Sequence, residues 1–290
     1  MKPLVPNGKL ILIGGKEARK PENKVSDNNE QKADFDNGVL MEILKEVDEN
    51  PVIEVIPMAS EDQEEVGKMY IDTFAKLNQK ANVIFMNNSK DANNPAFVER
   101  IEKADIVFLT GGDQKKLFKY LHESAVLKTI IQRYEYEDLV IVGTSSGAMV
   151  MGEHMIIAGE SDEAVLKGLI DTEDAFNIIP NVVIDTHFLS RGRFSRLAEA
   201  LLINNDDIGI GICEDTGVVI TEGNKLRTIG SGTVVLMEGS NIKSSNYLYA
   251  KDKDPLFIEN LTIHVLAQGA GYDLQRRKFA VLEKKMQVVH

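Results

Sequence analysis

One serine of this sequence stands in a pattern that could support acyl transfer. Ser145 lies between Gly143 and Gly147 and follows the apolar run at residues 139–142, which predicts a buried strand. The Gly-x-Ser-x-Gly spacing is typical of a nucleophile elbow, a tight turn that holds its serine in a strained backbone conformation. Flanking residues must be small there, and Ser146 meets that demand, as the two glycines do. The pattern predicts a serine hydrolase with Ser145 as its nucleophile.

A glycine pair elsewhere could help to hold the negative charge that develops during acyl transfer. Gly111 and Gly112 follow the apolar run at residues 106–110, and glycine lets a backbone N–H approach a bound carbonyl closely. We expect the N–H groups of Gly112 and Ser146 to form an oxyanion hole, assisted by the dipole of the elbow helix. The alternative is a plain strand-to-helix turn in which Asp113 caps the helix.

His187 is the histidine best placed to act as a base for the serine. It follows the apolar run at residues 182–185, and the carboxyl ends of parallel strands meet at one edge of a sheet. A nucleophilic serine needs such a base, and the base needs an acid that orients it. The alternative is a structural histidine after a strand. The other histidines are His122, His154, His264 and His290.

Glu214 is the leading candidate for the acid because it too follows a strand, expected at residues 208–213. Position is the only reason for this preference, so other carboxylates stay open as alternatives. These are Asp185, Glu160, Asp162 and Asp215. The order serine, histidine, acid differs from the serine, acid, histidine order of α/β-hydrolases, which argues against an ordinary esterase or lipase.

Three arginines follow the candidate base, namely Arg191, Arg193 and Arg196. The guanidinium fork of arginine binds a carboxylate through two parallel hydrogen bonds. Beside a catalytic histidine, such a cluster predicts a pocket for an acidic group of the substrate. The alternative is a solvated basic turn that opens a helix.

The segments that carry these residues alternate between buried strands and helices. Strands are expected at residues 9–13, 51–56, 83–86, 106–110 and 139–142, and helices at 35–47, 66–77, 95–103 and 114–136. This alternation predicts an α/β fold with a mostly parallel sheet and helices on both faces. The site of such a fold lies outside the carboxyl ends of the strands, where Gly112 and Ser145 fall.

The sequence changes character beyond about residue 205. Short strands separated by turn residues are expected at 208–212, 217–221, 226–229 and 233–237. They predict a meander that forms a β-rich edge on the C-terminal side of the sheet. Linkers, repeats and low-complexity segments are absent from the sequence, so we expect residues 1–290 to form a single domain.

The composition and spacing exclude several classes of function. A net charge of −12 argues against nucleic acid as a partner, because binding a phosphate backbone needs a basic face. The single cysteine, Cys213, excludes an internal disulfide. We find no metal-ligand spacing, and the Gly14-Gly15 turn lacks the spacing of a dinucleotide site, so no cofactor is expected. The sequence shows no signal peptide or membrane span, which predicts a cytoplasmic protein, or a secreted one if a leader has been removed.

Five motifs in the same order resemble those of the serine peptidase family that contains cyanophycinase and dipeptidase E. The matching segments are Gly14-Gly15, 110–114, 143–152, 185–197 and 209–216, with a late Gly-x-Gly-Thr-Val segment at 230–234. The resemblance implies a fold like that of class I glutamine amidotransferases and a triad of Ser145, His187 and Glu214. The residues that match positions of the substrate pocket are Gln114, Asp185, Arg191, Arg193 and Arg196.

The substrate that the resemblance implies is cyanophycin, a poly-aspartate with arginine joined to each β-carboxyl group. The family's cyanophycinases release β-Asp-Arg dipeptides by cleaving the aspartate backbone. The pocket would then hold carboxylates, for which the three arginines are suited. It would also hold a guanidinium, for which Asp185 or other acidic residues are candidates.

Two positions depart from the family pattern. Ser146 stands where the family usually carries alanine, and the Gly-x-Ser-x-Gly spacing still selects Ser145 as nucleophile. Thr186 stands in the expected pocket where glutamine is usual, so the substrate preference stays open. The alternatives are a peptidase for other aspartyl or β-aspartyl peptides and a catalytically silent binding protein on the same scaffold. The resemblance also implies a possible homodimer.

Overall fold

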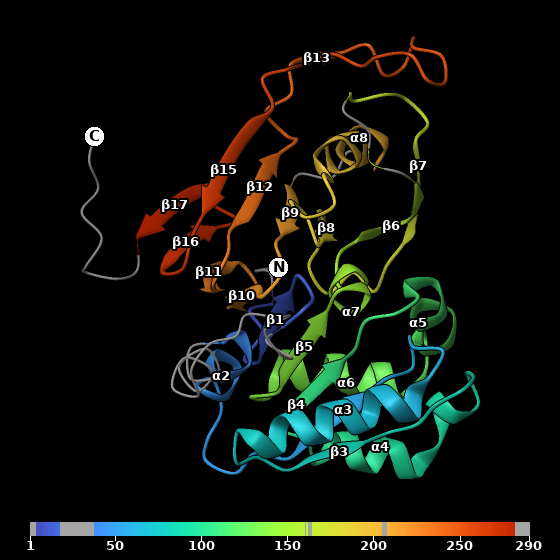
Figure 1. Ribbon diagram of the computed structural model, residues 1–290, viewed down its shortest axis with the longest axis vertical. Coiled ribbons are helices and arrows are strands. Elements are labelled where there is room, and N and C mark those ends of the chain that lie inside the picture. The colour runs from blue at the N-terminus through green and yellow to red at the C-terminus, as the bar shows by residue number, and fades with distance from the viewer. Residues whose placement is uncertain (1–3, 18–37, 160, 162–163, 205–207, 282–290) are drawn as a thin grey trace, which may run out of the picture.

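The computed structural model contains a nine-stranded sheet of order β17-β16-β11-β10-β1-β5-β4-β2-β3 (Figure 1). The structure describes residues 4–17, 38–159, 161, 164–204 and 208–281. The strands of this sheet are β1 (Lys9–Ile13), β2 (Ile53–Ile56), β3 (Ala81–Val83), β4 (Ile106–Leu109), β5 (Val140–Thr144), β10 (Thr216–Thr221), β11 (Lys225–Gly230), β16 (Ala270–Asp273) and β17 (Lys278–Val281).

The half of this sheet that runs from β1 to β3 is parallel. Every residue of β2, β4 and β5 is buried, which is why apolar residues predominate in these strands; buried Glu54 of β2 is charged and pairs with Arg100. The expected α/β fold is therefore confirmed. The expected strand at residues 83–86 is shifted, because β3 ends at Val83 and only the Ile84 N–H still bonds to β2, at the Val55 carbonyl (2.9 Å).

Helices cover both faces of the parallel strands. Their bounds are α2 (Val39–Leu44), α3 (Gln63–Lys76), α4 (Pro95–Glu102), α5 (Gln114–Leu121), α6 (Ala125–Tyr136), α7 (Ser146–Met149) and α8 (Phe194–Asn204), with a 3-10 turn at Asp91–Asn93. Ile11 and Ile13 pack in one cluster with α2 and α3, whereas Leu10 and Leu12 pack in another with α4, α5 and α6. β1 thus lies in the middle of the molecule, with apolar side chains on both of its faces.

The helix expected at residues 114–136 is two helices. Glu123 adopts a positive φ of 60°, which ends the helical path after α5. Ser124 then caps α6, because its Oγ accepts a hydrogen bond from the Leu127 N–H at 3.1 Å.

A second sheet of six strands has the order β15-β12-β9-β8-β6-β7. Its strands are β6 (His154–Gly159), β7 (Ile170–Asp174), β8 (Val182–Thr186), β9 (Ile208–Ile212), β12 (Val234–Glu238) and β15 (Thr262–Leu266), and a small hairpin joins β13 (Ser244–Ser245) to β14 (Ile258–Glu259). β8 and β9 are parallel, so their carboxyl ends meet at the same edge.

The expected meander is wrong, although the β-rich C-terminal edge is confirmed. β10, β11, β16 and β17 form that edge of the nine-stranded sheet, whereas β9 and β12 pair in the second sheet. The chain crosses between the sheets at residues 213–215 and 231–233. Asp215 (φ 48°) and Gly230 (φ 89°) adopt positive φ at these crossings, so the backbone turns away from its previous neighbour.

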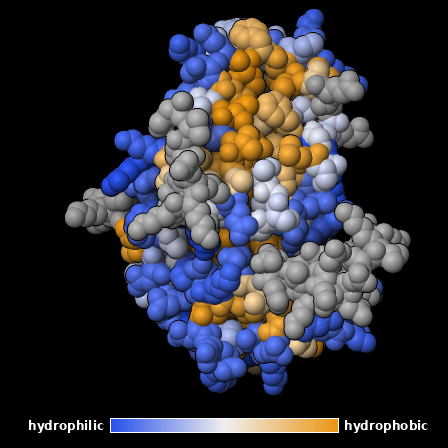
Figure 2. Space-filling model, turned by 60° about the vertical axis from the view of Figure 1, so that its left-hand side comes forward, coloured by the Kyte–Doolittle hydropathy of each residue, from blue (hydrophilic) through white to orange (hydrophobic). Residues whose placement is uncertain are grey.

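Apolar surface gathers over the half of the molecule that carries β12 and β15 (Figure 2). β15 is an edge strand, and its Ile263 and Val265 side chains are exposed. Exposed apolar edge strands are common contact surfaces between protein chains; the expected homodimer stays a prediction. Within the described ranges, no helix has the length and apolar character needed to cross a bilayer.

Candidate active site

Ser145 occupies a strained turn between β5 and α7. Its backbone angles are φ 53° and ψ −120°, a conformation that costs energy for any residue with a side chain. The turn leaves no room beside it: a Cβ added to Gly143 would lie 2.3 Å from the Gly147 carbonyl oxygen, and one added to Gly147 would lie 2.2 Å from the Leu109 carbonyl oxygen. The spacing of small residues in the sequence follows directly from this crowding.

The turn brings Ser145 to His187 and Glu214. Ser145 Oγ lies 3.1 Å from His187 Nε2, and His187 Nδ1 lies 2.8 Å from Glu214 Oε1. Both distances are within hydrogen-bond range, so the imidazole connects the Ser145 hydroxyl to the Glu214 carboxylate. The serine follows a strand of the first sheet, whereas the histidine and glutamate follow β8 and β9 of the second. The three residues therefore meet where the two sheets adjoin.

The competing histidines and carboxylates lie elsewhere or are already engaged. His122 stacks on Phe118, His154 is 3.9 Å from Asp174, and His264 bonds to Glu238. Asp215 accepts a hydrogen bond from Ser231, and Asp185 is held by arginines. His290, Glu160 and Asp162 lie outside the described residues.

Three successive carbonyl groups at the end of β1 hold the three loops of the site together. The Ile13 carbonyl accepts from the Ser145 N–H, the Gly14 carbonyl from the His187 N–H and the Gly15 carbonyl from the Asp215 N–H, each at 2.9 Å. Because these acceptors are consecutive along one chain, the spacing of the three loops is set by the covalent geometry of that segment. The first glycine pair of the sequence is therefore part of the scaffold of the site.

Gly15 also lies directly against the imidazole ring of His187. A Cβ added to Gly15 would lie 2.5 Å from His187 Cε1 and 2.6 Å from Nε2, and Gly15 itself has a φ of +93°. His187 adopts a positive φ as well, at 49°. Sequence reasoning considered this glycine pair as a dinucleotide motif and as a family motif, and it missed the contact with His187. Its position after the first strand was the available signal.

Burial sets the protonation of His187. Loss of solvation lowers the pKa of His187 below its usual value, the hydrogen bond to Glu214 opposes that shift, and the charge of Arg191 adds to it. The imidazole is therefore neutral at pH 7, which is the form that can accept a proton from a serine.

Glu214 remains ionised beside this ring. Burial favours its neutral form, but hydrogen bonds from His187 and Ser190 and the charge of Lys16 together hold the pKa of Glu214 below its usual value. Ser190 Oγ donates to Glu214 Oε1 at 3.1 Å, and Lys16 Nζ lies 3.4 Å from Oε2. Sequence reasoning missed both partners.

Two backbone N–H groups beside Ser145 have no acceptor among the residues that the structure describes. They belong to Gly112 and Ser146, the pair expected to form an oxyanion hole. Gly112 has a φ of +147°, and a Cβ there would lie 2.2 Å from the Ala59 carbonyl oxygen, so only glycine fits. The neighbouring Gly111 faces the serine, because a Cβ there would lie 3.0 Å from Ser145 Cβ.

The Ser146 hydroxyl points away from His187. Its Oγ donates to the Gly112 carbonyl at 2.5 Å and lies 3.1 Å from Gln114 Oε1. Of the two adjacent serines, Ser145 is thus the one whose hydroxyl meets the imidazole. Gln114 was expected to contact substrate, but its Nε2 donates to the Ile156 carbonyl at 2.8 Å. Both ends of its amide are engaged within the protein.

The arginine cluster is mainly internal. Asp185 is fully buried, and its carboxylate accepts hydrogen bonds from Arg193 at 2.9 Å and from Arg196 at 2.7 and 3.0 Å. The expectation that Asp185 receives a substrate guanidinium is wrong for this arrangement, because protein guanidinium groups already occupy both oxygens. Thr186 is also fully buried, so its side chain is out of reach of a substrate. Arg191 is the arginine of the three that is exposed.

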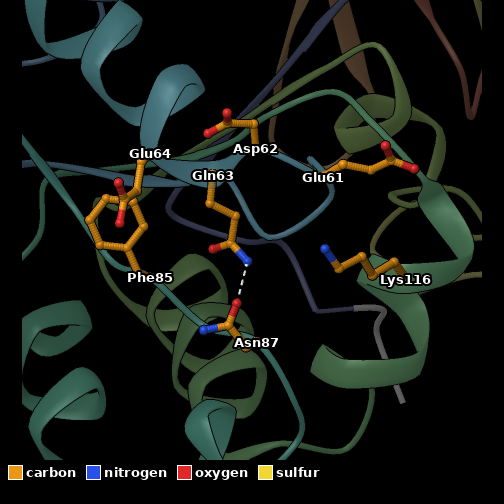
Figure 3. A pocket seen from close by; sticks show the side chains of 7 residues that line it. All are labelled: Glu61, Asp62, Gln63, Glu64, Phe85, Asn87 and Lys116. Atoms are coloured by element: carbon orange, nitrogen blue, oxygen red, sulfur yellow. Dashed lines mark hydrogen bonds between the residues drawn. The ribbon is translucent and has the colours of Figure 1, made fainter.

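A pocket of about 320 Å³ lies between the start of α3, the segment after β3 and Lys116 of α5 (Figure 3). Its lining residues are Glu61, Asp62, Gln63, Glu64, Phe85, Asn87 and Lys116. Lys116 donates to the Ser60 carbonyl at 2.8 Å, and Ala59 lies against Gly112. Among the residues described here, no three His, Cys, Asp or Glu side chains are grouped to hold a metal.

Comparisons with known proteins identify relatives of this chain. The model of peptidase family S51 matches residues 25–229. A cyanophycinase of Geminocystis herdmanii is 34% identical over 223 residues, which cover 77% of this chain and 82% of that protein. A cyanophycinase of a Nostoc species is 34% identical over 226 residues, covering 78% and 76%. Peptidase E of Pasteurella multocida is 28% identical over 146 residues, covering 48% and 59%.

A solved structure has the same fold. The crystal structure of a peptidase from an acI-B1 Actinobacterium superposes with a TM-score of 0.64 at 21% identity, covering 93% of this chain and 98% of that one. The family match extends over well more than half of the sequence, and the cyanophycinase relatives are similar over most of it. The chain belongs to peptidase family S51 and is a serine-type peptidase.

Proposed function

We propose that the protein is a cyanophycinase-like peptidase in which Ser145, His187 and Glu214 form the catalytic triad. The observation that carries this proposal is the hydrogen-bond path from Ser145 Oγ through His187 to Glu214, at 3.1 and 2.8 Å. Two free N–H groups beside the serine, those of Gly112 and Ser146, support it. The cyanophycinase relatives, at 34% identity, support the choice of substrate class.

The proposed reaction begins with proton transfer from the serine. His187 Nε2 accepts the proton of Ser145 Oγ as the oxygen attacks a peptide carbonyl carbon, and Nδ1–H donates to Glu214, which stabilises the imidazolium. The N–H groups of Gly112 and Ser146 hold the oxyanion; one such donor typically contributes about 3–4 kcal/mol to the transition state.

The intermediate then collapses toward products. His187 Nε2–H protonates the leaving amine as the C–N bond breaks, which leaves an ester on Ser145. His187 next takes a proton from water as the water attacks this ester, and returns that proton to Ser145 Oγ. The serine and the histidine are then ready for another cycle.

A second candidate is a peptidase for aspartyl or β-aspartyl peptides that lack a guanidinium. It is favoured by the engaged state of Asp185, whose carboxylate is held by Arg193 and Arg196. Exposed Arg191 could still bind a substrate carboxylate.

Purified cyanophycin separates these candidates. The wild-type protein and the Ser145→Ala variant are incubated with it, and release of β-Asp-Arg is followed by mass spectrometry. Release by wild type alone is expected. No release, together with cleavage of other aspartyl peptides by the wild type, would support the second candidate. A wild-type protein that cleaves neither, and that a fluorophosphonate fails to label, would contradict the proposed function.

A further inference from the structure

The Ser146 side chain bonds to the loop that presents Gly112. Ser146 is buried, so its 2.5 Å hydrogen bond to the Gly112 carbonyl is sheltered from water. Gln114 Oε1 lies 3.1 Å from the same hydroxyl oxygen, and Gln114 is fixed in turn by its bond to Ile156. The Gly112 carbonyl oxygen and Gln114 Oε1 are both acceptors for the single hydroxyl proton, and the shorter distance favours donation to the Gly112 carbonyl.

The peptide between Gly112 and Asp113 is held at both of its polar atoms. Ser146 Oγ holds the carbonyl oxygen, and the Asp113 N–H donates to the Ala59 carbonyl at 2.9 Å. Gly111 and Gly112 have no Cβ, so this stretch of backbone could otherwise rotate at low steric cost. Rotation of this peptide would turn the Gly112 carbonyl oxygen toward the developing negative charge. The Gly112 N–H belongs to the preceding peptide, and the bond from Ser146 restrains it through the shared Gly112 Cα.

Ser146 thus contributes to the expected oxyanion hole in two ways. Its own N–H is one of the two free donors, and its side chain fixes the residue that carries the other. We infer that the Ser146 hydroxyl is a positioning group that sets the spacing between the two oxyanion donors. This inference rests on the proposed serine-peptidase function.

The Ser146→Ala variant tests this role, because alanine keeps the N–H and removes the hydroxyl. The readout is the rate at which a fluorophosphonate labels Ser145. In that reaction Ser145 Oγ bonds to phosphorus, His187 takes the proton, fluoride leaves, and the phosphoryl oxygen lies in the hole. We expect the rate to fall about tenfold, which is less than the 10²–10³-fold cost of losing a whole donor.

The control variant is Ser124→Ala, which also removes a buried serine hydroxyl but from the cap of α6. It should be labelled at the wild-type rate. On the substrate that the wild type cleaves, Ser146→Ala should lower kcat by the same factor and leave KM within about twofold, since the hole acts mainly on the transition state. A purely structural role would not produce this split.

Each outcome decides the inference. Equal labelling of wild type and Ser146→Ala overturns it, as does a slower rate that accompanies a larger fall in unfolding midpoint than Ser124→Ala shows. A label found on Ser146 by mass spectrometry also overturns it. A wild-type protein that is neither labelled nor able to cleave cyanophycin or another aspartyl peptide contradicts the proposed function itself, so the two failures are distinguishable.

Discussion

Two histidine–glutamate pairs in the described part of the chain have the same separation but different surroundings. His187 Nδ1 lies 2.8 Å from Glu214 Oε1, and His264 Nε2 lies 2.8 Å from Glu238 Oε1. The first pair follows two parallel strands and meets a serine. The second lies within the antiparallel strands β12 and β15. The distance between an imidazole and a carboxylate therefore does not identify a catalytic pair.

The second pair joins the two sheets. Glu238 is buried and also accepts hydrogen bonds from the Tyr272 hydroxyl and from Asn241. Burial and this contact with Glu238 raise the pKa of Tyr272, so the phenol stays protonated as a donor. Tyr272 belongs to β16 of the nine-stranded sheet, whereas Glu238 and His264 belong to the six-stranded one. The cluster thus acts as a bridge in the core.

Backbone conformation separates the two pairs most clearly. Ser145, His187 and Asp215, which follows Glu214, all have positive φ, between 48° and 53°. His264 and Glu238 lie in regular strands. Strained backbone persists only where the surrounding structure holds it, and here the carbonyl groups of residues 13–15 do so. The contrast suggests that the strain serves to aim the proposed triad.

Matched histidine variants give the largest expected contrast. His187→Ala should lower kcat by about 10⁴-fold or more, because a triad loses most of its effect when any member is removed. His264→Ala should leave kcat unchanged and lower the free energy of unfolding by about 1–3 kcal/mol, because buried Glu238 loses a donor. Steady-state kinetics and urea unfolding on both variants check this. A large loss of activity in His264→Ala at unchanged stability would contradict the comparison.

Matched carboxylate variants extend the contrast. Glu214→Gln should lower kcat by about 10²–10⁴-fold, because the amide can stabilise the wrong tautomer of His187 and does not stabilise the imidazolium. Glu238→Gln should lower stability and leave kcat unchanged. An amide NH2 group in place of a carboxylate oxygen cannot accept the hydrogen bonds that Tyr272 and His264 donate. Activity per folded molecule and the unfolding midpoint separate the two effects. Equal activity losses in the two variants would argue against the assignment of Glu214.

The sequence predicted those parts of the fold and site that depend on local patterns. Continuous apolar runs gave the parallel strands, and the Gly-x-Ser-x-Gly spacing gave the elbow. The meander prediction failed because local strand patterns do not reveal which sheet a strand joins. That choice depends on the crossings near Asp215 and Gly230.

Pairings between side chains were the least predictable part. Arg193 and Arg196 had the chemistry to bind a substrate, but the structure places them on Asp185 of this chain. Asp185 lies only a few residues before these arginines in the sequence. The residue types alone do not distinguish an internal ion pair from an open pocket. The role of Gly15 was also hidden, since its contact is with a ring far along the chain.

A glycine variant tests whether activity depends on the close approach of Gly15 to the His187 ring. Gly15→Ala places a Cβ 2.5 Å from His187 Cε1, so the ring must move; a shift of about 1 Å can cost about 10²-fold in rate. Gly192→Ala is the control, because Gly192 also has a positive φ of 60° but no described atom lies within 4 Å of the added Cβ. Gly192→Ala should lose about 1 kcal/mol of stability and keep its activity. Parallel loss of kcat in both variants would show that strain, and not contact with His187, is responsible.

The smallest expected effect is on the pH dependence of the reaction. His187 must be neutral to accept the serine proton, so activity falls as the pH drops through its pKa. The Arg191 charge disfavours the imidazolium, hence Arg191→Gln should raise the pKa of His187 and move the acidic limb of kcat/KM to higher pH. Arg191 is exposed, so the shift should be small and should shrink in 1 M salt, where the screening length falls to about 3 Å. Arg276→Gln, at a distant exposed arginine beside Asp273, should leave the limb in place. A limb that moves to lower pH in Arg191→Gln would mean that Arg191 does not act on His187 through its charge.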